Sequence, residues 1–195
     1  MFGLTKEMFK LVRTTYLQAD RINQGDIISD VEFIEAAEEI DGIITVAKII
    51  FPLVIVLTQD CDLTWDFDSR QIGSSNQDKY LFSIIVAPLY NYEHFINGDH
   101  LSELHQKMAI IPSKMTATAN KNLRQNETPR YHYLEFDSTV PIVNSVIDFK
   151  HYFTVNVQKL QKQKTEHYVC SVSELFRERI SQRFASYLSR IGLPN

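Results

Sequence analysis

The sequence predicts an α+β domain built around a small β-barrel, with helical extensions at the N- and C-terminal ends. With 195 residues, of which 44% are hydrophobic, the chain is long enough to bury one sizeable core. Several short apolar segments have strand character and lie between helical patterns near the two ends. These strands do not alternate regularly with helices, which disfavours a doubly wound parallel sheet.

We expect a single domain over residues 1–195. Its barrel core covers about residues 22–90 and 129–172, a helical insertion covers about residues 91–125, and a C-terminal helix covers about residues 172–191.

The N-terminal part predicts a helix followed by two strands. Apolar side chains at three- and four-residue spacing indicate a helix over residues 5–20, which ends before Gly25. Residues 26–34 and 42–50 have strand composition, and the acidic segment 35–41 between them is expected to be a turn or a short helix.

The middle of the chain begins with a continuous apolar run, FPLVIVLT, at residues 51–58. Such a run is typical of a strand buried on both faces, and Pro52 lies near its start, where no ladder donor is lost. A polar, acidic loop is expected at residues 59–68 and another strand at residues 80–89.

The second half is expected to hold further strands and one long helix. Strands are predicted at residues 131–136, 145–149, 152–155 and 167–172, with a polar hairpin tip or short helix at residues 158–164. Ser171 and Glu174 predict a capping box for the C-terminal helix. Its apolar residues recur at a 3.6-residue period, and Gly192 predicts its end.

Composition indicates which cellular compartment and which binding partners to expect. A net charge of −4 disfavours non-specific nucleic-acid binding over the whole surface but leaves a local basic stripe open. Two cysteines are too few for a disulfide framework and favour a reducing compartment. The N-terminus lacks the features of a secretory signal, and no apolar run approaches the ~20 residues of a membrane span. We therefore expect a cytoplasmic protein without a membrane partner.

The string TQDCDL at residues 58–63 is the first candidate site, because it follows a strand expected to be buried. Asp60 and Asp62 flank Cys61; one carboxylate could act as a base, or both could hold a divalent cation. The carboxylates make Cys61 a poor nucleophile unless a metal is bound, and Gln59 is a candidate partner contact. Alternatively, Cys61 is a small buried residue and the aspartates cap a turn or helix.

The string RYHYLE at residues 130–135 is the second candidate. On a strand, Arg130 and His132 share one face, where they could stabilise a phosphate and move a proton, as nucleases require. The alternative is an exposed strand whose polar face lies in water.

A basic stripe on the C-terminal helix is the third candidate. Arg179, Arg183 and Arg190 fall within about 40° of one another and could contact phosphates of a partner. Alternatively, their stems lie on the core and their guanidinium groups pair with acids.

Motifs for cofactors are absent. The six histidines show no zinc-ligand spacing, and there is neither a Gly-rich phosphate loop nor a G-x-S-x-G elbow. We expect no cofactor, although a divalent metal at the two aspartates is possible.

Three strings resemble, in the same order, the PemK/MazF toxins, which are small SH3-like barrels that cut RNA. They are GDII at residues 25–28, FPLVIVL at residues 51–57 and IIVAPL at residues 84–89. The resemblance covers residues 25–90 and implies an SH3-like barrel core and a possible homodimer. It does not extend to the RNA-cleaving residues, because Phe51 replaces the family's arginine and Tyr90 replaces its threonine.

Three further strings are similar to a group of uncharacterised bacterial proteins that we associate with mobile or phage-defence loci. They are TQDCDL at residues 58–63, RYHYL at residues 130–134 and RFASYLSRIGLP at residues 183–194. We therefore expect a binding or regulatory component of a phage-defence or toxin–antitoxin-type system, which holds a protein partner, RNA or DNA. The alternative is a nucleic-acid-cleaving enzyme, either metal-dependent at Asp60 and Asp62 or based on Arg130 and His132.

Overall fold

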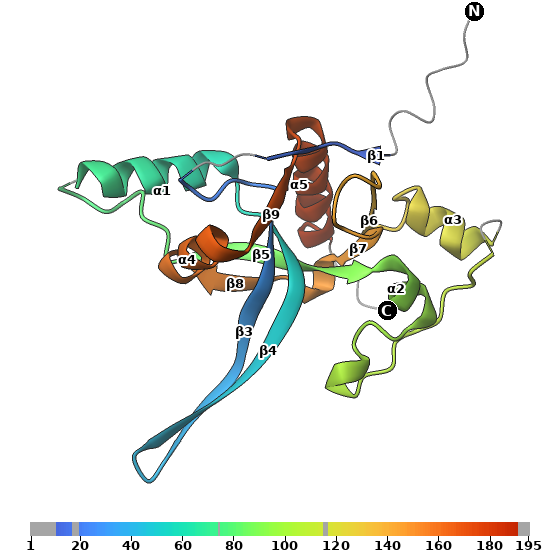
Figure 1. Cartoon of the computed structure of the whole chain (residues 1–195), viewed down its shortest axis with the longest axis horizontal. Coiled ribbons are helices and arrows are strands. Elements are labelled where there is room, and N and C mark those ends of the chain that lie inside the picture. Colours follow the sequence, from blue (N-terminus) through green and yellow to red (C-terminus); the bar gives the residue numbers. More distant parts are fainter. Residues whose placement is uncertain (1–10, 17–19, 74, 115–116, 191–195) are drawn as a thin grey trace, which may run out of the picture. The chain divides into compact units, whose positions relative to one another are not determined.

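The computed structural model describes residues 11–16, 20–73, 75–114 and 117–190, and within these ranges it holds nine strands and five α-helices (Figure 1). The chain divides into two compact units. The hairpin unit comprises Tyr16–Pro88 and Tyr152–Ser171, and the terminal unit comprises Met1–Thr15, Leu89–His151 and Val172–Asn195. In the described ranges, no helix combines the length and the apolar character needed to cross a membrane.

A long antiparallel hairpin organises the hairpin unit. β3 (Asp26–Ile40) and β4 (Ile43–Val56) pair along their length around a turn at Asp41 and Gly42. Both turn residues have positive φ, 53° and 78°, as a two-residue hairpin turn requires. The expectation of a turn or short helix at residues 35–41 is wrong, because the Asp-Gly pair places the turn later and leaves the exposed glutamates on β3.

Three further strands complete the sheet of the hairpin unit. β5 (Ser83–Asn91) pairs with β4, β8 (Phe153–Asn156) pairs with β5, and β9 (Tyr168–Val172) pairs with β3, all antiparallel. α4 (Val157–His167) connects β8 to β9, and α1 (Asp60–Ile72) follows β4. The strand order is β9-β3-β4-β5-β8, and the sheet is open. The α+β class is thus confirmed, and a closed barrel is not seen.

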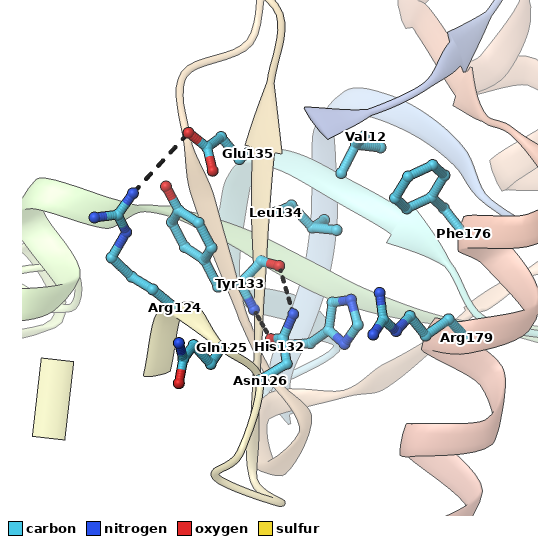
Figure 2. Close-up of a pocket in the computed structure, with 10 residues that line it drawn as sticks. All are labelled: Val12, Arg124, Gln125, Asn126, His132, Tyr133, Leu134, Glu135, Phe176 and Arg179. Carbon is cyan, nitrogen blue, oxygen red and sulfur yellow. Dashed lines mark hydrogen bonds and ion pairs between the residues drawn. The ribbon is translucent and has the colours of Figure 1, made fainter. Parts of the chain in front are cut away.

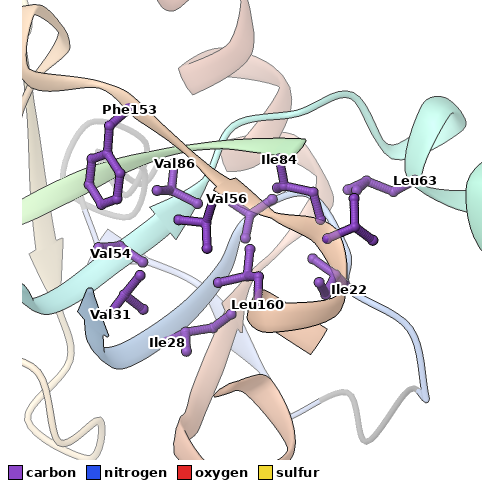
Figure 3. Packing of buried hydrophobic residues seen from close by; sticks show 12 residues of the cluster. Ile22, Ile28, Val31, Val54, Val56, Leu63, Ile84, Val86, Phe153 and Leu160 are labelled. Atoms are coloured by element: carbon purple, nitrogen blue, oxygen red, sulfur yellow. The ribbon is translucent and has the colours of Figure 1, made fainter. Parts of the chain in front are cut away.

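The core of the hairpin unit lies between these strands and α4 (Figure 3). Val54, Ile55 and Val56 are buried, which confirms the prediction for this part of FPLVIVLT, whereas Phe51 and Leu53 are half-buried and Pro52 is exposed. The ring of Phe153 lies 5.2 Å from the rings of both Phe33 and Phe51, so β8 packs against the hairpin as well as pairing with β5.

The terminal unit is built on β6 (Tyr131–Phe136). This strand pairs with β7 (Ser145–Asp148) in antiparallel and with β1 (Leu11–Val12) in parallel, and β7 pairs with the last three residues of β5. Its remaining elements are β2 (Thr14–Thr15), α2 (Tyr92–Asn97), α3 (Thr118–Arg124), α5 (Glu174–Leu188) and two 3-10 turns at Ser102–Leu104 and Phe149–His151. α5 buries Phe184, whose ring lies 5.5 Å from that of Phe149.

Three local expectations are wrong. Within the predicted N-terminal helix, residues 11–12 and 14–15 form β1 and β2, and residues 5–10 and 17–19 lie outside the described residues. The loop expected at residues 59–68 is helix α1. Acidic side chains in its first turn stabilise the helix, because they lie near the positive end of the helix dipole. Ser171 does not cap α5, because it lies in β9 and its hydroxyl donates to Asp26 at 2.5 Å. Gly192, the predicted helix stop, is outside the described residues.

Candidate functional site

The acidic string of the hairpin unit opens α1, with the exposed Gln59 at the N-cap position. Asp60 forms an ion pair with Arg21 (Oδ2 to Nη2, 3.2 Å) and accepts the Gln24 N–H at 3.1 Å. Helix residues two apart point about 200° apart, so Asp62 projects to another side than Asp60. Asp60 therefore connects α1 to the segment before β3.

Cys61, between these aspartates, is exposed, and its Sγ lies 3.9 Å from Asp62 Oδ1. Among the residues that the structure describes, no group of three or more acidic, histidine or cysteine side chains is arranged to hold a metal ion.

Arg130 of the terminal unit is held by a buried carboxylate. Its Nε and Nη2 donate to Asp148 Oδ1 and Oδ2 at 2.8 and 2.5 Å. His151 Nδ1 lies 3.6 Å from Asp148 Oδ2 and 3.0 Å from the hydroxyl of Tyr90. The ion pair raises the pKa of Arg130, and burial lowers the pKa of His151 and raises that of Tyr90. These four residues form one polar network that joins β5, β7, the following 3-10 turn and the residue before β6, with hydrogen bonds within the Arg130–Asp148 and Tyr90–His151 pairs.

His132 occupies a different environment from Arg130. It is 2% exposed, and its Nδ1 atom has no hydrogen-bond partner. Burial and the nearby Arg183 and Arg179 lower its pKa to about 3. The imidazole is therefore neutral at physiological pH, which makes it a poor proton carrier but leaves a ring nitrogen free to bind a ligand.

A cavity of about 320 Å³ lies beside His132 within the terminal unit (Figure 2). We call it the His132 pocket; its lining includes Arg124, His132, Tyr133, Leu134, Phe176 and Arg179. Figure 2 shows the His132 ring and the Arg179 guanidinium pointing toward each other, from β6 and α5.

Side chains next to β6 hold the strand in place at the wall of this pocket. The Asn126 side chain binds the Tyr133 backbone on both sides, accepting its N–H at 2.6 Å and donating to its carbonyl at 3.1 Å. This amide replaces a neighbouring strand at the edge of β6. Beside it, Arg124 lies 4.0 Å from the Glu135 carboxylate and 5.6 Å from the Tyr133 ring centroid.

The predicted arginine stripe divides into different roles. Arg183 donates to the carbonyls of Thr128 and Tyr131, both at 2.8 Å, and Arg190 lies 3.9 Å above the ring of Tyr187. The guanidinium groups of these two arginines therefore contact other parts of the terminal unit. Arg179 is exposed and lines the His132 pocket.

Two buried side-chain atoms without a hydrogen-bond partner, His132 Nδ1 and Arg124 Nε, belong to residues that line this pocket. Five such atoms are found among the described residues, and a third, Arg183 Nε, belongs to the arginine that helps to lower the pKa of His132. Because buried polar groups are nearly always satisfied, each exception calls for an explanation such as an absent ligand.

The structure therefore brings together His132, Arg179 and Arg183, which the sequence singled out separately, and it pairs Arg130 with Asp148 instead. Sequence reasoning missed Asp148, His151 and Tyr90 as a network and Arg124 as a pocket residue. The one signal available for Asp148 was an acid at the end of an apolar strand.

Searches with protein-family models and against curated proteins and solved structures found no match, so the geometry carries the functional argument.

Proposed function

We propose that the protein is a binding module that holds a phosphate group of a nucleic acid in the His132 pocket. The observation that carries this proposal is the buried, neutral His132, whose Nδ1 has no partner and which lies close to two arginines. A phosphate oxygen accepts hydrogen bonds from guanidinium groups and from the Nδ1–H tautomer of a neutral imidazole, and charge-assisted hydrogen bonds from arginine are among the stronger ones.

The remaining walls suit the nucleoside next to that phosphate. Tyr133, Leu134 and Phe176 supply apolar and aromatic surface, and Arg124 supplies a second guanidinium beside Glu135. Aromatic surface next to a cationic site is a common way to hold a single-stranded base. With a net charge of −4, a local pocket fits better than binding along a whole surface.

The wider setting is a proposal that rests on the resemblances in the sequence. A binding or regulatory component of a phage-defence or toxin–antitoxin-type system would combine this pocket with a protein partner. The cytoplasm is the compartment that this role implies.

The SH3-like barrel remains our proposal for the hairpin unit. The order β9-β3-β4-β5-β8 supports it, with α4 connecting the two edge strands. The contacts of Phe153 with Phe33 and Phe51 also support it, because they curl β8 back onto the hairpin.

Equilibrium binding of fluorescently labelled single-stranded RNA and DNA tests the function. We expect Arg179→Ala to weaken binding at least about tenfold, as loss of a charged hydrogen bond does, and to reduce the salt dependence by about one phosphate contact. The matched control is Arg177→Ala, on the same helix, whose guanidinium pairs with Glu174 at 3.2 Å. Equal affinities of the two variants, or no binding by the wild type, would contradict the proposal.

Cleavage of nucleic acid is the second candidate, and the network of Arg130, Asp148, His151 and Tyr90 favours it, because it contains groups able to bind a phosphate and move a proton. The same oligonucleotides, separated on a denaturing gel with Mg²⁺ present or chelated, test this candidate. Cleavage lost in Asp60→Ala would assign it to the acidic string, and cleavage lost in His151→Ala would assign it to the network.

A further inference from the structure

The distal part of the β3–β4 hairpin, residues 34–50, forms what we call the hairpin arm, a two-stranded ribbon visible in Figure 1. β9 pairs with β3 only over Asp26–Ile28, and β5 pairs with β4 only over Val54–Val56. Within the described part of the chain, both outer edges of the arm therefore have no neighbouring strand. Unpaired edges present backbone donors and acceptors that readily pair with another strand.

The arm also exposes aliphatic side chains. Those exposed by about half or more are Ile34, Ile40, Ile43, Ile44, Val46 and Ile50. An isolated two-stranded ribbon is at best marginally stable in water, and clustered exposed apolar groups indicate an interaction surface.

Charge distinguishes the two edges of the arm. In the arm, β3 carries Glu35, Glu38 and Glu39, whereas Lys48 is the one charged residue of β4. Lys48 is itself paired with Glu32 on the neighbouring strand. Charged side chains protect an edge against association, so β3 is protected and β4 is open.

We propose that the β4 edge of the arm pairs, antiparallel, with β4 of a second copy of this chain. Pairing extends over residues 43–51 and ends at Pro52, which has no N–H to donate. The centre of that segment, Ala47, then lies on the two-fold axis. Ile44 lies opposite the partner's Ile50, and Val46 lies opposite the partner's Lys48.

Electrostatics favour this arrangement over pairing through β3. In a β3-β4-β4-β3 sheet, the acidic strands of the two copies lie three strand spacings apart, roughly 14 Å, beyond the Debye length of about 8 Å at physiological salt. Pairing through β3 would bring the glutamates of both copies within about 5 Å of one another, where like charges repel.

Sedimentation over a range of protein concentrations tests the dimer. We expect the wild type to dimerise and Val46→Lys to weaken the dimer at least about tenfold, because it places two ammonium groups opposite each other twice per dimer. The matched control is Ala37→Lys, which adds the same charge to the β3 residue that pairs with Val46. It should leave the dimer intact, because β3 is one strand away from the interface.

Cysteine cross-linking tests the register independently of any loss of folding. In a Cys61→Ser background, Ala47→Cys should form a disulfide-linked dimer on oxidation, whereas Ala36→Cys, its pairing partner on β3, should not. A wild type that stays monomeric at all concentrations would overturn the proposal. So would equal weakening by both lysine variants, or equal cross-linking at both cysteine positions.

Discussion

Lys164 and Asp26 form a buried ion pair in the hairpin unit, with Nζ 2.7 Å from Oδ2. Asp26 is fully buried and Lys164 is 4% exposed. The carboxylate also accepts the N–H of Asn23 at 2.8 Å and the hydroxyl of Ser171, and the ammonium donates to the carbonyl of Arg21. The pair therefore connects β3, α4 and β9.

Removal of one partner of this pair should be costly. We expect Asp26→Ala to lower the free energy of unfolding by about 3–5 kcal/mol, because it leaves a buried ammonium without its counter-ion. Adding Lys164→Met should recover part of the loss. Urea denaturation measures both, with Glu174→Ala, which removes an exposed ion pair, as the control. A loss no larger than that of the control would show that the carboxylate is not needed.

His132 should make stability dependent on pH. Its pKa is about 3 in the folded chain, against 6.5 for an unperturbed histidine. Between these values the unfolded chain binds a proton that the folded chain does not. Stability is therefore complete above pH 6.5 and declines as the pH falls toward 3, by about 1.4 kcal/mol per pH unit.

Denaturation at a series of pH values, with His132→Phe for comparison, checks this dependence. The variant should show a shallower decline. Some decline should remain, because burial and His151 lower the pKa of His100 to about 4 as well. Identical slopes for the two proteins would contradict the assignment to His132.

Phe184 should anchor α5. Its side chain is 7% exposed and its ring lies 5.5 Å from that of Phe149. We expect Phe184→Ala to destabilise the protein by about 3–5 kcal/mol through lost burial and the cavity that remains. Thermal denaturation provides the measurement, and Leu188→Ala, at an exposed position of the same helix, is the control. Similar effects of the two substitutions would mean that α5 is weakly packed.

The two aspartates of the acidic string should differ. Asp60→Ala removes the ion pair with Arg21 and should lower the melting temperature with or without Mg²⁺, whereas Asp62→Ala should have little effect. Thermal melting in Mg²⁺ and in chelator measures both. A Mg²⁺-dependent shift in the wild type that both variants lose would instead support the predicted metal site.

Sequence patterns predicted β6 and α5. β6 matches the predicted strand at residues 131–136, and the apolar residues of α5 recur at helical spacing in the sequence. α1 was missed because its first residues are acidic and resemble a polar loop, and because Gln59 at its N-cap position makes no side-chain capping hydrogen bond that would mark the helix start. The distal part of β3 was missed because its side chains face solvent on both sides of a ribbon.

The candidate site was predictable only as separate pieces. His132 and Arg179 were each identified, but no local pattern joins a strand residue to a helix residue so far along the chain. Nor does composition reveal that Asp148 engages Arg130, because this choice depends on how β7 is placed beside β6. Tertiary pairing decides that Arg130 engages a buried carboxylate and that Arg179 lines the His132 pocket.

The interleaving of the two units along the chain has a consequence for biosynthesis. Asp26 pairs with Ser171 across the β3–β9 ladder, and α5 follows almost at the end of the described chain. The hairpin unit cannot form before β9 has been synthesised, and the terminal unit cannot form before α5 has been synthesised. Each unit therefore depends on contacts between segments that are far apart along the chain, and such a high contact order favours slow folding.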